Sequence, residues 1–300
     1  MDALLAEEML KSLSLDLDTS GALLDKAHPV RGAICAPPVP NRRGATMSEE
    51  AIFLNSGPLF SGERLEAMED LPEWASLEEE ARSAYNRIRE AFEKHSTLLA
   101  GSPSLEETRF FMINPTLHAL GFTHSVYEPV PTQTGSVARV DYALFPNAEE
   151  FAQAREMRGS LSFYRASLGL GKAVAWTGDL DEAPPEPPAR QVEQEDGEDD
   201  EDQVRLPSQE ATYNPGILPA AELDALLRET TVDYGLLTNG WLWRVYHRGT
   251  SERLDTFFQA DLIAAIKSDF EDFKRFYLLF RRDAFIKGTS GTSFVDNMLQ

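Results

Sequence analysis

The sequence predicts an α/β fold in which helices flank a mixed β-sheet, and three observations predict it. A capped helix precedes two extended patterns, HSVYEPVP (124–131) and SVARVDYALF (136–145). The pair Asn239-Gly240 lies between two alternating apolar stretches, which is the strongest short-range indication of a β-hairpin. A stretch that begins at Asp261 places apolar residues three and four apart, the spacing of a helix that packs on a core.

The composition adds an acidic segment to an otherwise ordinary globular chain. The 300 residues are 42% hydrophobic and carry 50 acidic and 28 basic residues, a net charge of −22. Half of that charge lies between Asp179 and Asp202, where twelve acids accompany one arginine. We expect residues 179–209 to be a disordered insertion, because so few apolar groups cannot offset the entropy of ordering. So acidic a chain can contact nucleic acid only through a local basic patch.

The single cysteine, Cys35, excludes a disulfide framework and a CxxC metal or redox site. It indicates a reducing compartment, and no apolar stretch is long enough to span a bilayer. The sequence therefore predicts a cytoplasmic protein with no membrane association.

The domain organisation follows from changes of pattern along the chain. We expect a flexible leader over 1–57, a helical extension over 58–103, an α/β domain over 104–285 and a tail over 286–300. The leader holds one expected helix, from Leu4 to Leu13, before a stretch rich in Pro, Gly and Ala.

The first long helix is predicted from a capping box, because Ser76 and Glu79 have the required spacing. An amphipathic pattern continues from there to Leu99, and Gly101 is placed to end the helix.

A second capping box, Ser104 with Glu107, starts the next predicted helix, which runs to Leu120 with Gly121 as its C-terminal cap. Pro115 lies inside this helix, so we expect a kink there or a restart with proline in the first turn.

Extended structure then dominates the predicted order. After the two strands already given, with Gly135 in the turn between them, residues 148–168 are expected to be helical or looped, and 171–177 form a third strand. A helix over 219–229 leads into the Asn-Gly hairpin.

The last two elements are that hairpin and the C-terminal helix. In the hairpin's second strand, Trp241, Trp243 and Val245 alternate with Arg244, so they lie on the opposite face from it. The C-terminal helix is expected to run from Asp261 to about residue 285.

Most motifs of common enzymes are absent from the sequence. It contains no GxGxxG, GxxxxGK[ST], GxSxG or HExxH, and its five histidines lack ligand spacing. Nucleotide-fold and zinc chemistry are therefore not expected.

Carboxylates do recur where a helix and strands would meet at a sheet edge. Glu107 shares its helix with Arg109, Glu128 and Asp141 lie on the first two strands, and Asp181 follows the third. Oxygen ligands in that arrangement suit Mg²⁺ in a phosphodiesterase, while ordinary solvated acids at strand ends are the alternative.

An ordered set of segments resembles a known family. The segments SLEETRFFMINPTLHALGF, VYEPVP, VDYALF, AWTGDLD and LLTNGWLWRVY are similar to the N-terminal region of type IIG restriction-modification enzymes and of related adenine methylases in DISARM-type phage defence. The similarity covers about residues 58–285 without the acidic segment. It implies a restriction-endonuclease-like fold with a PD-(D/E)xK nuclease scaffold.

In that family pattern Asp141 is the metal-binding aspartate. The next strand carries an acid-x-Lys triplet just before an Ala-Trp pair, and this position holds Lys172-Ala173-Val174 here. Lysine thus replaces the acid and valine the lysine, so the resemblance implies a broken nuclease motif. Glu107 or Glu128 could supply a migrated acid, with Lys172 as the catalytic lysine.

Two functions follow from the resemblance, and a third follows from the acidic segment. The first is a degenerate nuclease-like module that associates with DNA, or with a larger defence complex containing a methyltransferase or helicase. The second is an active Mg²⁺-dependent DNA endonuclease that uses a migrated acid. The third is an acidic DNA mimic or self-shielding regulator. No NPPY-type tetrapeptide or glycine-rich cofactor loop is present, so methylation by this chain alone is not expected.

Overall fold

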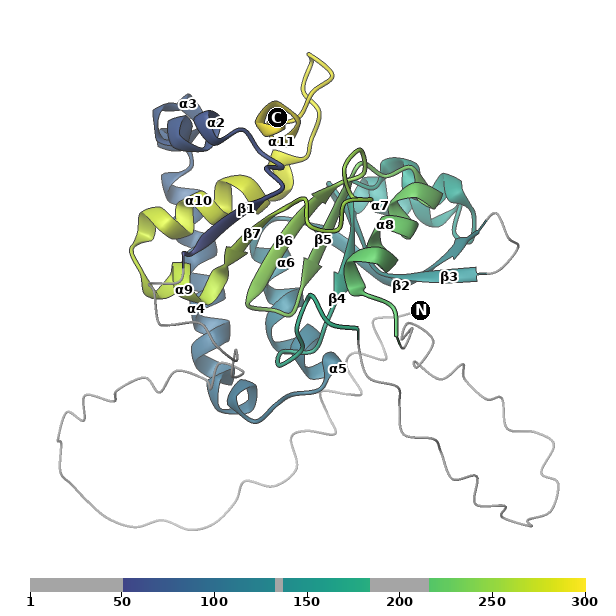
Figure 1. Ribbon diagram of the computed structural model, residues 1–300, viewed down its shortest axis with the longest axis horizontal. Helices are drawn as coiled ribbons and strands as arrows, with labels where there is room; N and C mark the ends of the chain where they lie inside the picture. Colours follow the sequence, from purple (N-terminus) through teal and green to yellow (C-terminus); the bar gives the residue numbers. More distant parts are fainter. Residues whose placement is uncertain (1–50, 133–136, 184–215) are drawn as a thin grey trace, which may run out of the picture. The chain divides into compact units, whose positions relative to one another are not determined.

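The computed structural model describes residues 51–132, 137–183 and 216–300, and these contain a seven-stranded mixed sheet flanked by helices (Figure 1). The strand order is β1-β7-β6-β5-β4-β3-β2. The pair β4/β5 is parallel and the other neighbouring pairs are antiparallel. The predicted α/β class and mixed sheet are confirmed.

The strands are β1 (Phe53–Ser56), β2 (Thr123–Pro131), β3 (Val137–Phe145), β4 (Gly169–Ala173), β5 (Tyr234–Thr238), β6 (Leu242–His247) and β7 (Phe257–Asp261). The α-helices are α2 (Gly62–Glu66), α3 (Pro72–Ser76), α4 (Glu78–Ala100), α5 (Leu105–Thr108), α6 (Asn114–Ala119), α7 (Ala148–Arg155), α8 (Pro219–Thr230), α9 (Leu262–Lys267), α10 (Phe270–Phe280) and α11 (Phe294–Met298). Short 3₁₀ segments and one π-helical turn, Arg109–Ile113, connect several of them.

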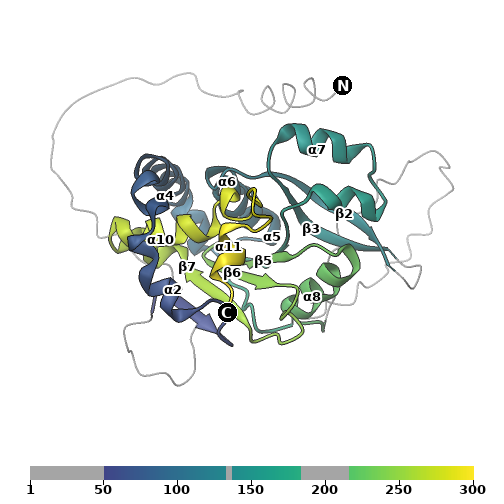
Figure 2. The same ribbon diagram turned by 90° about the horizontal axis from the view of Figure 1, so that it is seen from above.

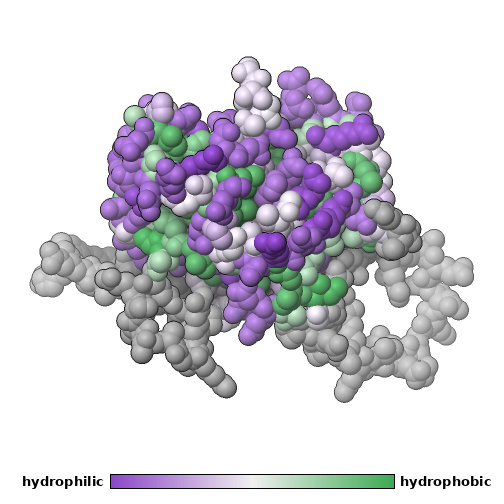
Figure 3. Space-filling view, turned by 45° about the horizontal axis from the view of Figure 1, so that its top comes forward, coloured by the Kyte–Doolittle hydropathy of each residue, from purple (hydrophilic) through white to green (hydrophobic). Residues whose placement is uncertain are grey.

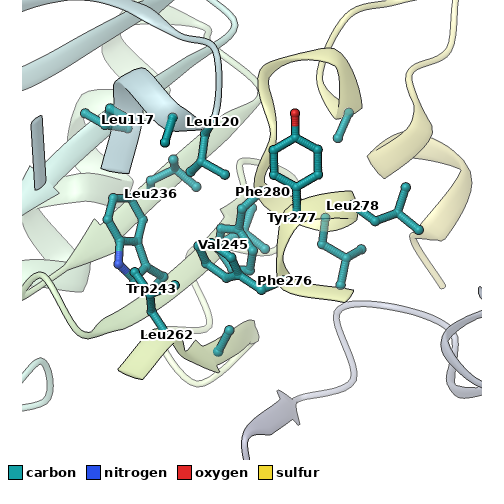
Figure 4. Packing of buried hydrophobic residues seen from close by; sticks show 14 of the residues in the cluster. Leu117, Leu120, Leu236, Trp243, Val245, Leu262, Phe276, Tyr277, Leu278 and Phe280 are labelled. Carbon is teal, nitrogen blue, oxygen red and sulfur yellow. The ribbon is translucent and has the colours of Figure 1, made fainter. Parts of the chain in front are cut away.

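Hydrophobic side chains bury both faces of the sheet. On one face α6, α9 and α10 cover the sheet and α4 packs on α6 and α10, and Figure 4 shows Trp243 and Val245 meeting Phe276 and Phe280 there. On the other face α8 covers β4 and β5, with Leu223 and further apolar residues forming a second cluster. Figure 2 shows α8 on the opposite side of the sheet from α4 and α10.

The Asn-Gly hairpin forms as predicted. β5 and β6 pair from Tyr234↔His247 to Thr238↔Trp243, and Gly240 has a φ of 93° that suits glycine. The Asn239 side chain accepts the backbone N–H of residue 242 at 2.9 Å, which closes the turn.

The N-terminal boundary differs from the prediction. Residues 53–56, inside the predicted leader, form edge strand β1, which pairs with β7 through Phe53↔Ala260. The predicted helical extension is helical, but Ile88 and Phe92 of α4 belong to the same apolar cluster as the sheet. A four-residue strand shows too little alternation to be recognised from its pattern.

The C-terminal tail also belongs to the fold. Val295 and Met298 of α11 are buried, and Leu299 forms an antiparallel bridge with Phe60. The residues after 285 therefore pack beside the segment that follows β1.

Two helix predictions need correction. The Ser76–Glu79 capping box does not form, because α3 ends at Ser76 and Leu77 is the N-cap of α4. The predicted C-terminal helix is two helices, since α9 ends at residue 267 and α10 has its own N-cap, Asp269, whose side chain accepts the N–H of residue 272.

Several expectations fall outside the described residues. These are the leader helix at 4–13, the leader as far as residue 50 and the acidic insertion from residue 184 to 209. Within the described ranges, none of the helices combines the length and the apolar character needed to cross a bilayer. The face seen in Figure 3 is largely hydrophilic, with smaller hydrophobic areas between.

Candidate functional site

The predicted site begins at α5, whose capping box forms as the sequence indicates. The Ser104 hydroxyl accepts the Glu107 N–H at 3.2 Å, and the Glu107 carboxylate accepts the Ser104 N–H at 2.8 Å. The Ser104 N–H and the Ser104 hydroxyl both donate to the Glu107 carboxylate, and these two hydrogen bonds lower the pKa of Glu107. Glu107 therefore stabilises a helix end, and the structure does not bring it to Asp141.

Asp141 lies on β3 at a position where backbone pairing with both neighbouring strands is interrupted. The β2/β3 pairs on either side are Val126↔Tyr142 and Glu128↔Val140, and Tyr127 between them has a left-handed φ of 57°. The β3/β4 pairs cover residues 142–144 of β3. In place of a further backbone pair, Asp141 Oδ2 accepts the N–H of Ala173 at 2.8 Å. The carboxylate thus closes the end of the β3/β4 ladder.

A buried network of opposite charges surrounds this aspartate. Arg109 Nη2 lies 2.9 Å from Asp141 Oδ1, and Lys172 Nζ lies 3.6 Å from Asp141 Oδ2. Lys172 Nζ also lies 2.7 Å from Glu222 Oε2 at the start of α8. The side chains are 4%, 1%, 8% and 12% exposed for Arg109, Asp141, Lys172 and Glu222, in that order. We call these four residues the Asp141 network.

The arginine of the network also contacts two residues outside it. Arg109 Nη1 donates to Glu106 Oε1 at 3.0 Å, and its guanidinium carbon lies 4.5 Å from the centroid of the Tyr127 ring. The Tyr127 hydroxyl donates to the same glutamate. Glu106 and Tyr127 thus hold Arg109 in place, so its guanidinium does not depend on Asp141 alone for its position.

Glu128 is engaged elsewhere. Its side chain is 2% exposed and pairs with Arg158, whose Nε donates to Glu128 Oε2 at 2.7 Å. This bidentate pair joins β2 to the segment after α7. Neither Glu107 nor Glu128 is therefore placed as the migrated acid that the sequence suggested.

The chemistry of the donor set does not fit Mg²⁺. Both oxygens of Asp141 face cationic or N–H donors, and within residues 51–132, 137–183 and 216–300 no three His, Cys, Asp or Glu side chains are grouped to hold a metal. A divalent ion about 4 Å from one lysine charge costs on the order of 8 kcal/mol at an effective dielectric near 20. Asp141 is instead part of an ion-pair network.

The segment after β4 is fixed against the hairpin. Trp176 N donates to Thr108 Oγ1 at 2.9 Å, and Trp241 Nε1 donates to the Trp176 carbonyl at 2.9 Å. Asn239 Nδ2 donates to the Gly178 carbonyl at 3.0 Å. These bonds connect α5, the segment after β4 and the β5/β6 turn at one end of the central strands.

Asp181, at the end of that segment, forms a bidentate pair with Arg244 of β6 rather than joining Asp141. The sequence identified Asp181 as an edge acid but not its partner. The sequence analysis also missed Glu222, because an acid in the first turn of a helix is common and gives no reason to single it out.

Two histidines lie close to Tyr142, the residue that follows Asp141. The His118 and His124 rings are 5.5 Å apart, and His124 packs on Tyr142, whose hydroxyl donates to Asn114 Oδ1 at 2.8 Å. Burial, with a smaller contribution from His118, lowers the pKa of His124 to about 4. Burial also raises the pKa of Tyr142. His124 is therefore neutral near pH 7.

Comparison of the chain with protein-family models, with curated proteins and with solved structures gives no match.

Proposed function

We propose that this chain is a nuclease-like module of a restriction or phage-defence system, in which an ion-pair network has replaced the metal site. It acts by binding rather than by cleavage, as a DNA-associated or assembly component in the cytoplasm. The single observation that carries the proposal is the Asp141 network, because it puts two cations where the family pattern has a metal and a second acid.

The placement of the motif residues supports the nuclease-like scaffold. In the family pattern the metal-binding aspartate and the acid-x-Lys triplet lie on consecutive strands. Asp141 lies on β3 and Lys172 on β4, and these strands are neighbours in the sheet. The Lys172 ammonium group lies 3.6 Å from Asp141 Oδ2, so the two motif positions meet in space.

The burial of the network supports the loss of cleavage. Lys172 is held by two acids at once, since its Nζ lies 3.6 Å from Asp141 Oδ2 and 2.7 Å from Glu222 Oε2. A metal ion bound by Asp141 would leave the buried charges of Arg109 and Lys172 short of a partner, and leaving a buried charge without its partner typically costs about 3–5 kcal/mol.

A role in assembly has separate support in an exposed aromatic group. Phe110, in the π-helical turn, is 70% exposed and packs edge-on against Phe111 with ring centroids 5.1 Å apart. Exposed aromatic side chains of this kind act as anchors in protein interfaces. A methyltransferase or helicase of the same system is the partner that the family resemblance suggests.

The test compares cleavage and binding in one series. Wild type, Asp141→Ala and the control Asp70→Ala, which removes an exposed acid from another part of the chain, are incubated with supercoiled plasmid and Mg²⁺ or Mn²⁺. The same proteins are titrated against a fluorescent DNA duplex at several salt concentrations.

We expect duplex binding that weakens as salt rises, and no metal-dependent nicking by any of the three proteins. Mn²⁺-dependent nicking that wild type and Asp70→Ala show and Asp141→Ala lacks would establish an active endonuclease instead. Absence of binding both to DNA and to the methyltransferase or helicase of the same system would remove the proposal altogether.

A further inference from the structure

Two buried cationic side chains share one row across the sheet. The register pairs Lys172 with Leu237, Leu237 with Arg244, and Arg244 with Gln259. Directly paired residues point to the same face of a sheet, and neighbouring strands lie about 4.8 Å apart. Arg244 therefore lies on the same face as Lys172, about 10 Å away, and the Asp141 network does not use it.

Neighbouring side chains fix the orientation of the Arg244 guanidinium. Its Nε donates to Gln259 Oε1 at 2.7 Å, and its guanidinium carbon lies 4.1 Å from the centroid of the Phe257 ring. The side chain is 4% exposed. Both contacts come from β7, so they persist whatever occupies the two terminal nitrogens.

The two terminal nitrogens of Arg244, Nη1 and Nη2, donate to an exposed carboxylate. Arg244 Nη1 donates to Asp181 Oδ1 at 2.6 Å and Nη2 donates to Asp181 Oδ2 at 2.8 Å, while the Asp181 side chain is 66% exposed. A guanidinium that presents two parallel N–H groups suits a carboxylate or a phosphate equally well. The open side of the pair faces solvent.

The carboxylate can leave without moving the chain around it. Leu180 is 1% exposed, and the carbonyls of Trp176 and Gly178 are held by Trp241 and Asn239. The backbone before Asp181 is thus anchored, so a ligand can replace the exposed carboxylate by rotation of the Asp181 side chain, without a backbone movement.

We propose that Arg244 is a binding site for a phosphate group, which Asp181 occupies when no ligand is present. This inference rests on the proposed DNA association, in which the phosphate is a phosphodiester of DNA; free inorganic phosphate has the same chemistry and is the other source. The net charge of −22 repels DNA, so a contact with a DNA phosphate depends on a local cation. That cation has to be held in place and has to exchange its carboxylate partner for the phosphate.

Three variants test the site. Asp181→Ala removes the competing carboxylate, and Glu182→Ala removes the same charge from the adjacent exposed residue. Asp181→Ala/Arg244→Lys keeps a positive charge at the site but removes the two-pronged donor. Each is titrated with a fluorescent DNA duplex at low salt and, separately, with inorganic phosphate, with binding of phosphate followed by thermal stabilisation.

We expect Asp181→Ala to bind the DNA duplex about two- to five-fold more tightly than Glu182→Ala, the range that removal of a partly exposed ion pair produces. The double variant should lose this gain. Comparison of melting temperatures without ligand shows whether the lysine has changed the fold; if it has, Asp181→Asn, which keeps the shape of the side chain, provides the decisive comparison with Glu182→Ala.

The outcomes separate this inference from the proposed function. A gain of affinity for inorganic phosphate in Asp181→Ala without any binding of DNA keeps the phosphate site and rejects DNA as its source. Equal affinities of Asp181→Ala and Glu182→Ala for both probes overturn the site, even where wild type binds DNA.

Discussion

Replacement of Asp141 by alanine tests whether this residue now serves the fold. The change leaves the side chains of Arg109 and Lys172, 4% and 8% exposed, with one acid fewer, and leaves the N–H of Ala173 without its acceptor. Breaking a buried ion pair from one side costs about 3–5 kcal/mol. We therefore expect Asp141→Ala to lower the free energy of unfolding by about that amount.

The assay is thermal unfolding, with urea unfolding as a second measurement. For a chain of this size 1 kcal/mol corresponds to roughly 2–4 °C, so the melting temperature should fall by about 6–20 °C. Asp70→Ala, at an exposed position, should change it by less than about 2 °C. Asp141→Asn keeps an acceptor for the N–H of Ala173 and should fall between the two.

A double-mutant cycle shows whether Arg109 is the origin of the effect. If it is, Asp141→Ala should cost clearly less in an Arg109→Met background, because the buried charge that lacks a partner is then gone. An unchanged or higher melting temperature of Asp141→Ala in the wild-type background would refute the reasoning. It would mean that the aspartate is kept at the expense of stability, as functional acids are.

The remaining predictions concern the core and its titration. Trp243→Ala should lower the free energy of unfolding by about 3–5 kcal/mol, measured by urea unfolding, because Trp243 is fully buried between the sheet and α10. Gly171→Ala should cost about 1–3 kcal/mol, since a Cβ there lies 2.9 Å from Cβ of Tyr142, whereas Gly62→Ala meets open space and should cost far less in the same thermal assay. His124 has a pKa of about 4 in the folded chain and 6.5 ordinarily, so the unfolded chain binds its proton first as the pH falls. Stability should therefore be lost between about pH 6.5 and pH 4, by up to about 3 kcal/mol, and urea unfolding of His124→Gln should lack that part of the loss.

Local patterns predicted those elements whose causes are local. The Asn239-Gly240 turn and the Ser104–Glu107 capping box depend on residues two or three positions apart, and both form as expected. The restart of the helix near Pro115 is also found, since α6 begins at residue 114 with proline in its first turn.

Elements whose causes are distant could not be predicted in the same way. β1 is four residues long, and its partner β7 lies about 200 residues further along the chain. The third strand ends at Ala173 rather than at residue 177, because Trp176 is held by the hydroxyl of Thr108. Such contacts leave no periodic pattern in the sequence.

The same distinction between local and distant causes applies to the candidate site. The sequence placed Asp141 and Lys172 on adjacent strands, and the structure brings their charged groups within 3.6 Å. It did not predict Glu222 or the pairing of Asp181 with Arg244, because both depend on how α8 and the segment after β4 lie over the sheet.

The pairing of β1 with β7 has a consequence for synthesis on the ribosome. At about 5–20 residues per second, the roughly 200 residues between these strands take about 10–40 s to be made. During that interval Phe53, which packs on Phe258 in the finished sheet, has no partner strand. Phe53 therefore stays without its partner strand until translation has passed β7, and a holdase that binds this segment should associate with the chain only before that point.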